Sequence, residues 1–593
     1  MSKFDTIIRG GTVIDGLRSG RYVADIGIRG GRIAAIGGLD GEAAQVLDAR
    51  GLIVAPGFID LHTHYDSQLY WDPWCSISSW HGVTSVAIGN CGFGFAPCKP
   101  EHRERAMLAM TRNEAVPLKT MQAGLPWDWE TFPEWMESLE RTPKGVNVLT
   151  YVPLSPLIMY VVGAEEAKRR RPTEAEMAEM CRLLEQAMEA GACGFSLQNL
   201  GVNSHQRDFD ASPMITDTMH DDDLVAFGTV LAKLGRGVIQ GIGGSMLMWE
   251  RMAQVSGRSI IYNTVSPMAD QHGVSNGRAE DTIAWIHDCN KRGLRIYGQA
   301  TTIENDLQFT MEDWNLFDFS PVWREATLGD HDERLAKLSD PARRAAIKAE
   351  YDGGYKMPAA GPDGIAGISV LWTENMALKD MDYEGRTIRE IAERDQVHPI
   401  DLFLDIIVKD DLKTGFALNT TPLEARTTDV YDQTLRLVGN DPYCIPGISD
   451  GGAHTKFLTT GCYPTDYLIQ FVRERQLVDL ESAHWHLSTL PAIASGFADR
   501  GYLQVGMPAD IVVYDLEGLE LEPQIKTYDY PANEWRLTQK AKGYHWTLIN
   551  GVVAFVGNDC TGATAGELLR HGHGASLVRA ATPGSPVHFG DMP

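Results

Sequence analysis

Eight short apolar runs, several of them preceded by a helix-like stretch that ends in glycine, constrain the fold of this 593-residue chain most strongly. In one such unit Thr173 and Glu176 form a capping box, apolar side chains follow at helical spacing, and Gly191 ends the helix before an apolar run. The same order recurs before 237–241 and before 294–298. Strands that alternate with helices build parallel sheets, and eight of them predict a (β/α)8 TIM barrel. The predicted strands are 58–62, 84–88, 146–151, 192–197, 237–241, 259–264, 294–298 and 443–448.

Both ends of the chain have a different sequence pattern, which predicts a small β-sandwich built from the two termini. Near the N-terminus, short runs separated by glycines are typical of hairpins, and strands around turns return near the C-terminus. These runs are 6–9, 11–14, 25–28, 32–36, 509–514 and 546–554. We therefore expect a sandwich from 1–57 and 500–560, a barrel domain at 58–499 with an insertion at about 301–440, and a C-terminal arm at 561–593.

Composition narrows the class of protein. The formal net charge of −26 argues against nucleic-acid partners, because phosphate binding needs clustered Lys and Arg. Nine scattered cysteines without paired short spacings indicate reduced thiols. Neither a signal peptide nor an apolar stretch long enough to span a bilayer is visible, which predicts a cytoplasmic protein without membrane partners. The insertion is expected to be a lid or an interface for self-association, and His571 and His573 are expected to lie in a solvated tail.

The first predicted strand ends in His62-Thr63-His64. Side chains two positions apart on a strand point to the same face, so both imidazoles can reach one ion, and imidazole nitrogen suits zinc. The next apolar run is followed by Cys91, a candidate third ligand. Active sites of this barrel lie at the carboxyl ends of the strands, which is where these residues fall.

Asp450 follows the eighth predicted strand and is expected to face the two histidines across the barrel mouth. It is a candidate metal ligand and a candidate general base that later acts as an acid. A protein-bound zinc ion lowers the pKa of its water to about 7 and polarises a carbonyl, which together predict hydrolysis of a C–N bond. His454 is a candidate for orienting Asp450 or the substrate.

Four motifs together resemble the amidohydrolase superfamily, and within it the N-acyl-D-amino-acid deacylase (D-aminoacylase) branch. They are PGFIDLHTH at 56–64, GNCG at 89–92, SDGGAH at 449–454 and RGYLQVGMPAD at 500–510. The resemblance covers nearly the whole chain and implies a barrel flanked by a β-sandwich from both termini. It also implies that Cys91 is a metal ligand, since this branch uses cysteine where relatives use a carboxylated lysine.

The chain departs from that branch at three positions. The resemblance implies a metal-binding histidine at the end of strands five and six, but Gln240 and Asn263 stand there. Amide groups are poor zinc ligands beside imidazole, which favours one zinc ion over two. The arginine expected to hold the carboxylate of a substrate is Ile242.

Three interpretations of the centre stay open at this stage. One ion is held by His62, His64 and Asp450, with Cys91 near or on it; or a loop histidine replaces the lost ligands; or the site is vestigial and the protein is a non-catalytic scaffold. The loop candidates are His205, His220 and His272.

The sequence thus predicts a metal-dependent hydrolase that cleaves an amide-type C–N bond of a small organic molecule. Ile242 in place of the arginine favours a neutral or cyclic amide over an N-acyl-D-amino acid, although the resemblance implies hydrolysis of an acyl-amino acid as the family default. A ring-opening hydrolase of lactams, imides or hydantoins is the enzymatic alternative. The residues expected to contact the substrate are Gln240, Asn263, His205 and His454.

Overall fold

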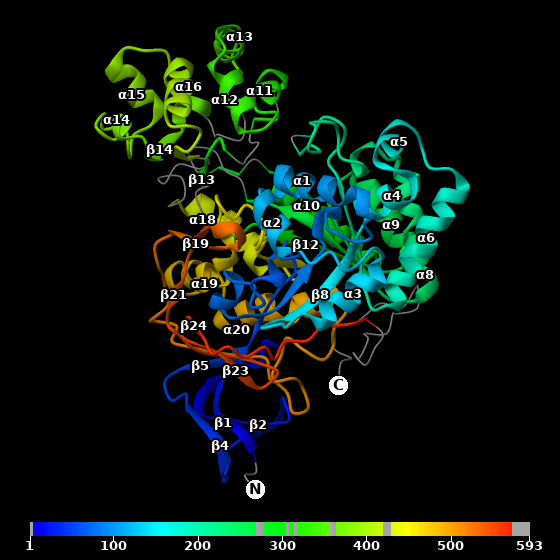
Figure 1. Cartoon of the computed structure of the whole chain (residues 1–593). Coiled ribbons are helices and arrows are strands. Elements are labelled where there is room, and N and C mark those ends of the chain that lie inside the picture. Colours follow the sequence, from blue (N-terminus) through cyan, green and yellow to red (C-terminus); the bar gives the residue numbers. More distant parts are fainter. Residues whose placement is uncertain are drawn as a thin grey trace.

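A parallel eight-stranded sheet forms the centre of the molecule in the computed structural model (Figure 1). The structure describes residues 4–204, 206–267, 274–275, 277–303, 308–312, 317–318, 320–355, 357, 363–418 and 428–571. An isolated parallel bridge between Thr63 and Gly451 joins the two outer strands. The strands, in chain order, are β6 (Phe58–Asp60), β7 (Val83–Ile88), β8 (Asn147–Pro153), β9 (Gly194–Asn199), β10 (Val238–Gly243), β11 (Ser259–Val265), β12 (Ile296–Ala300) and β16 (Cys444–Pro446).

All eight predicted strands are present, and the predicted TIM barrel is confirmed. Strands buried on both faces read as continuous apolar runs, and every residue of β7 and β8 is buried. The interior is a packed core that contains residues of seven of the strands, such as Ile59, Val238 and Ile445, together with Cys193 directly before β9.

Helices cover the outside of the sheet (Figure 1). The capping box predicted at Thr173 and Glu176 is confirmed at the start of α6, whose Met180, Leu184 and Met188 are buried. The helices between and after the strands are α1 (Arg103–Glu114), α2 (Leu118–Gly124), α3 (Phe132–Arg141), α4 (Leu154–Val162), α5 (Ala164–Arg169), α6 (Glu174–Glu189), α7 (Asp221–Ala226), α8 (Gly228–Leu234), α9 (Met246–Ser256), α10 (Arg278–Lys291), α18 (Asp429–Asn440), α19 (Tyr463–Tyr467), α20 (Leu480–His484) and α21 (Leu490–Ser495).

Strands from both ends of the chain form a second sheet, as predicted. Its N-terminal members are β1 (Phe4–Val13), β2 (Tyr22–Arg29), β3 (Arg32–Gly37), β4 (Ala43–Asp48) and β5 (Ile53–Pro56). Its C-terminal members are β17 (Ile511–Tyr514), β22 (Tyr544–Ile549), β23 (Val552–Val556) and β24 (Asp559–Cys560). Two small two-stranded sheets pair β18 (Glu520–Leu521) with β21 (Ala541–Lys542) and β19 (Ile525–Tyr530) with β20 (Glu534–Thr538).

The expected hairpin between 6–9 and 11–14 is wrong, because both runs belong to β1. The register of β1 against β2 shifts between Ile8 and Gly11, and Gly10 has a positive φ of 64°. The glycines therefore mark a bulge within one strand instead of a turn between two.

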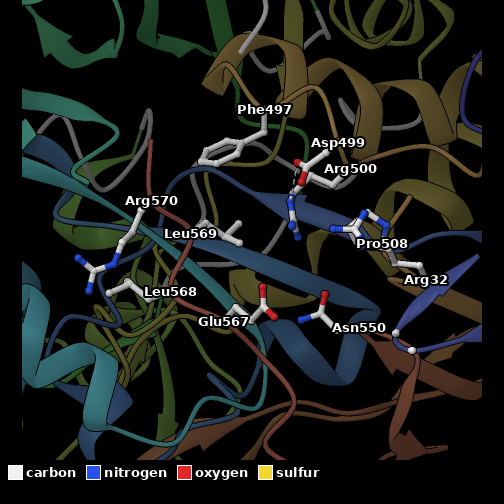
Figure 2. Close-up of a pocket in the computed structure, with 12 residues that line it drawn as sticks. Arg32, Phe497, Asp499, Arg500, Pro508, Asn550, Glu567, Leu568, Leu569 and Arg570 are labelled. Carbon is white, nitrogen blue, oxygen red and sulfur yellow. Dashed lines mark ion pairs between the residues drawn. The ribbon is translucent and has the colours of Figure 1, made fainter. Parts of the chain in front are cut away.

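The described part of the C-terminal arm, up to His571, crosses the amino ends of the barrel strands. Leu568 forms a bridge with Val148, and His571 is buried with its Nε2 2.9 Å from the carbonyl of Ser495. The expectation of a solvated tail is wrong for His571, and His573 lies outside the described residues. A cavity of about 540 Å³ lies here between arm, barrel and terminal sheet, and Figure 2 marks the ion pair of Asp499 and Arg500 in its wall.

The insertion between β12 and β16 has its own hydrophobic core and lies beyond the barrel at the upper left of Figure 1. This core also contains Ala115, which follows α1, and Phe457, which follows β16. The insertion therefore packs on the two segments that carry Glu114 and His454. Its elements are β13 (Gln308–Phe309), α11 (Pro321–Ala326), α12 (His331–Ser339), α13 (Pro341–Asp352), β14 (Ser369–Trp372), α14 (Met376–Lys379), α15 (Ile388–Asp395), α16 (Pro399–Lys409) and β15 (Gly415–Ala417).

Within the described residues, no helix combines the length and the apolar composition that crossing a membrane requires.

Candidate metal centre

His62 and His64 lie just past the end of β6. This strand ends at Asp60, earlier than predicted. The bridge of Thr63 to Gly451 keeps this segment extended, so the two imidazoles still share one side. Their ring centroids are 5.6 Å apart, and both side chains are buried. Burial and the neighbouring His62 lower the pKa of His64 to about 3. At neutral pH, His64 is therefore an uncharged imidazole, the form that binds metals.

Cys91 stands in a 3-10 turn, Asn90–Gly92, directly after β7. Its φ is +56°, a region that residues other than glycine rarely adopt, and the turn aims its side chain at His62. The Cys91 Sγ lies 3.3 Å from Nε2 of His62, and one donor atom from each of His62, His64 and Cys91 lies within 4.8 Å of the others. Burial raises the pKa of the Cys91 thiol, but a bound cation deprotonates a coordinating thiol.

Asp450 completes this group from the segment after β16, which the bridge of Gly451 to Thr63 holds beside the two histidines. Its Oδ1 lies 3.2 Å from Nε2 of His62 and 3.9 Å from Nε2 of His64. Burial alone would raise the pKa of Asp450, but the hydrogen bond and the charge of His62 outweigh it and hold this pKa well below its usual range. Asp450 is therefore ionised and can accept a proton.

Gln240 and Asn263 reach the same group from β10 and β11, and both are fully buried. The Oε1 atom of Gln240 accepts a hydrogen bond of 2.8 Å from the backbone N–H of Cys91. The Nδ2 atom of Asn263 lies 2.5 Å from Nδ1 of His62. Each amide thus faces a candidate ligand.

Glu114, at the end of α1, is a site residue that the sequence reasoning missed. Its Oε2 lies 3.7 Å from Nε2 of His64 and 3.4 Å from Nε2 of His454. Burial, together with the charge of Asp450, raises the pKa of Glu114 to about 8. A signal was available, because Met107, Met110 and Glu114 follow helical spacing and all three are buried.

A small apolar cavity of about 50 Å³ lies on the α1 side of the centre. Phe93 lines this cavity and also lies against the ring of His64, with centroids 6.5 Å apart. Its other apolar walls come from α1, α4 and the loop after β9, and include Ala106, Met110, Met159 and Ile215.

Comparison with known proteins identifies the family of this chain. The model of the amidohydrolase family matches residues 45–555. The chain belongs to the amidohydrolase family. N-acyl-D-glutamate deacylase of Alcaligenes xylosoxydans xylosoxydans is 28% identical over 93% of this chain and 94% of its own. D-aminoacylase of the same organism is 27% identical over 95% and 97%.

Solved structures agree on the fold of this amidohydrolase. The structure of N-acyl-D-glutamate deacylase from Bordetella bronchiseptica, complexed with zinc and a phosphonate inhibitor, matches with a TM-score of 0.63. The match covers 96% of this chain and 100% of that one, at 24% identity. The predicted amidohydrolase, a hydrolase of C–N bonds other than peptide bonds, is confirmed at the level of the family.

The amidohydrolase brings most of the predicted site residues together. His62, His64, Cys91, Asp450, Gln240, Asn263 and His454 converge at the carboxyl end of the barrel. His220 does not join them, since it caps α7 and its Nδ1 accepts from the N–H of Asp222. His205 and His272 lie outside the described residues.

The donors present fit a divalent metal ion. Two imidazoles, a thiol and a carboxylate converge, and these are the ligand types that zinc takes in proteins. Further support comes from Nδ1 of His64, which is buried and has no hydrogen-bond partner within the described residues.

Proposed function

We propose that this amidohydrolase cleaves the amide-type C–N bond of a small, uncharged organic substrate at a single divalent metal centre, with zinc as the expected ion. His62, His64, Cys91 and Asp450 are the proposed ligands. The observation that carries this proposal is the convergence of these four side chains within the barrel mouth.

The amides at Gln240 and Asn263 support one ion over two. A second ion would need further ligands on β10 and β11, and each of these amides is already engaged with a proposed ligand of the first ion. Amide oxygens also compete poorly with imidazole for zinc.

Asp450 is the proposed general base and acid. Because it is ionised beside His62, it can take up a proton from the attacking water and return it to the leaving nitrogen. A bound divalent metal would supply Lewis-acid polarisation of the substrate carbonyl and would lower the pKa of water. His454, whose Nε2 lies 3.4 Å from Glu114, is proposed to orient the substrate or Asp450.

Two features favour an uncharged substrate. Ile242 takes the place of the arginine that would hold a carboxylate. The cavity beside Phe93 has mainly apolar walls, and the one arginine among its lining residues, Arg105, is paired with Asp208 at 2.6 Å. Gln240 and Asn263 are proposed substrate contacts through the half of each amide that does not face Cys91 or His62. In Gln240 this is Nε2, which is buried without a partner within the described residues.

Deacylation of an N-acyl-D-amino acid is the second candidate. It is supported by the activities named for two relatives that align over most of the chain, N-acyl-D-glutamate deacylase and D-aminoacylase. A ring-opening hydrolase of cyclic amides remains a third chemistry to test, since it also needs no carboxylate site.

Metal analysis combined with a substrate panel tests the proposal. We expect about one zinc equivalent per purified chain, activity that is lost in chelator and restored by zinc, and faster turnover of neutral or cyclic amides than of N-acyl-D-amino acids. A metal content near zero, with stability unaffected by chelator, would contradict the metal centre. Faster turnover of N-acyl-D-amino acids would transfer the assignment to the second candidate.

Substitution of the proposed base gives a direct test of its role. Asp450→Asn keeps the shape of the side chain but cannot accept the proton, so we expect turnover to fall by about 100-fold or more while the fold is retained. Circular dichroism and kcat are the measurements. An unchanged kcat in correctly folded protein would exclude Asp450 as the proton shuttle.

Cytoplasmic location and self-association through the insertion stay predictions, to be checked by fractionation and by light scattering.

A further inference from the structure

Gln240 and Asn263 each contact one of the proposed metal ligands, although neither is proposed to bind the metal itself. They lie on neighbouring strands, β10 and β11, and each is at most 1% exposed. Each uses one atom of its amide group to contact a different proposed ligand, Cys91 or His62.

Asn263 contacts the ring nitrogen of His62 that does not face the other ligands. Nε2 of His62 lies 3.2 Å from Asp450 and 3.3 Å from Cys91, so the proposed ion binds at Nε2. A neutral imidazole that gives the lone pair of Nε2 to a metal carries its proton on Nδ1, and Nδ1 then needs an acceptor.

Asn263 can supply that acceptor without moving its backbone. Its Oδ1 has no hydrogen-bond partner within the described residues, and a half turn of the amide exchanges Oδ1 with Nδ2 at the 2.5 Å contact. In that orientation the amide oxygen accepts from Nδ1–H and fixes the tautomer in which Nε2 is free to bind.

Gln240 supports the second proposed ligand, Cys91, by a hydrogen bond to the backbone of Cys91. Its Oε1 accepts from the N–H of Cys91, a residue held at a φ of +56°. Ser196 assists one residue further on, where its Oγ accepts from the N–H of Gly92 at 2.9 Å. These two bonds hold the turn in the conformation that brings Sγ to His62.

We infer that Gln240 and Asn263 are positioning residues of a one-metal centre: Asn263 sets the tautomer and orientation of His62, and Gln240 holds the turn that presents Cys91. This inference rests on the proposed function, because it requires that His62 and Cys91 bind the metal. It explains why amides stand at these positions, since an amide can accept a hydrogen bond there and leaves the metal to the other ligands.

Matched substitutions at Asn263 test the tautomer. Asn263→Leu preserves volume and removes the acceptor, whereas Asn263→Asp keeps an oxygen that can only accept. We expect Asn263→Leu to weaken zinc binding by about 10- to 100-fold and Asn263→Asp to bind within about threefold of the parent or more tightly. The dissociation constant for zinc is measured on the full chain by competition with a chromophoric chelator, and thermal unfolding of the metal-stripped proteins is the control for folding.

The same design applies to Gln240. Gln240→Met removes the acceptor for the N–H of Cys91 at similar volume, and Gln240→Glu keeps it. We expect weaker zinc binding, by about 10-fold, for the methionine variant only.

The outcomes separate this inference from the proposed function. Absence of zinc binding by the unsubstituted protein overturns both. Zinc binding by the unsubstituted protein with equal affinities in all four variants, or equal losses in the acceptor-keeping and acceptor-lacking variants, overturns the positioning roles alone.

Discussion

Local backbone conformation positions individual side chains at the barrel mouth. Asp450 and Cys91 both have positive φ values, of 45° and 56°. The neighbouring Ser449 holds its segment to the residues after β6, because its Oγ donates to the carbonyl of His62 at 2.9 Å. A strained backbone that is held from several sides is typical of functional sites.

Cys91 is the donor whose role a single substitution tests most directly. Cys91→Ala should reduce zinc affinity by more than the about 100-fold that supporting residues reach, because it removes a ligand atom instead of its support. Cys98→Ala is the matched control, since Cys98 is buried nearby in sequence and its Sγ donates to the carbonyl of Lys99. Zinc titration measures both variants. Unaltered affinity in Cys91→Ala would remove the thiol from the proposed ligands.

Motifs on consecutive residues were predictable from the sequence, and a contact made by a distant helix was not. His62, His64 and Asp450 follow strands that share one end of the barrel, so their approach follows from the fold. Helical spacing places Glu114 on the buried face of α1, but its contact with His64 depends on how α1 packs on the barrel, which the spacing does not encode. The contacts of Gln240 and Asn263 with Cys91 and His62 likewise depend on side-chain orientations inside the barrel.

At the scale of helices and strands, the apolar pattern of the sequence predicted where the elements lie, but some of their predicted ends were wrong. Doubly buried strands such as β7 and β8 stand out as apolar runs. The run that holds β1 was divided wrongly, because a glycine at a bulge and a glycine at a turn look alike in sequence. Prediction of β6 extended past Asp60, since the residues after it stay extended through a single bridge.

The N-terminus of α6 provides a test at this scale. Thr173 Oγ1 accepts from the N–H of Glu176, and the Glu176 carboxylate accepts from the N–H of Thr173. Thr173→Ala should weaken this end by about 1 kcal/mol, and Thr173→Ser should not, because serine caps equally well. Hydrogen exchange of the amides at 174–177 measures the local effect. Equal exchange in the two variants would mean that packing alone holds this helix end.

At the scale of the whole molecule, a buried polar junction joins the terminal sheet to the barrel. Asp510, directly before β17, accepts hydrogen bonds from Arg500 at 2.9 Å, from Asn147 of β8 at 3.0 Å and from the N–H of Asn550 at 2.8 Å. Burial raises the pKa of Asp510 even though the charge of Arg500 opposes it. The expected domain boundaries at 57 and 500 stay a prediction, and this junction shows that the two units share a polar contact as well as the chain.

Removal of one member of this buried pair should therefore destabilise the whole protein. Asp510→Ala leaves the guanidinium of Arg500, which is 5% exposed, with only its longer contact of 3.4 Å to Asp499. Loss of one member of a buried pair costs about 3–5 kcal/mol. Replacing both residues, with Arg500→Met and Asp510→Leu, should restore part of that stability, because the buried guanidinium and carboxylate are removed together. The restoration is partial, since Asn147 and the N–H of Asn550 lose their acceptor. Asp48→Ala is the control in the same sheet, since its pair with Arg50 is solvent-exposed and contributes little. The urea midpoint of unfolding, followed by tryptophan fluorescence, compares the three. If Asp510→Ala unfolds at the same urea concentration as Asp48→Ala, the junction does not hold the terminal sheet to the barrel.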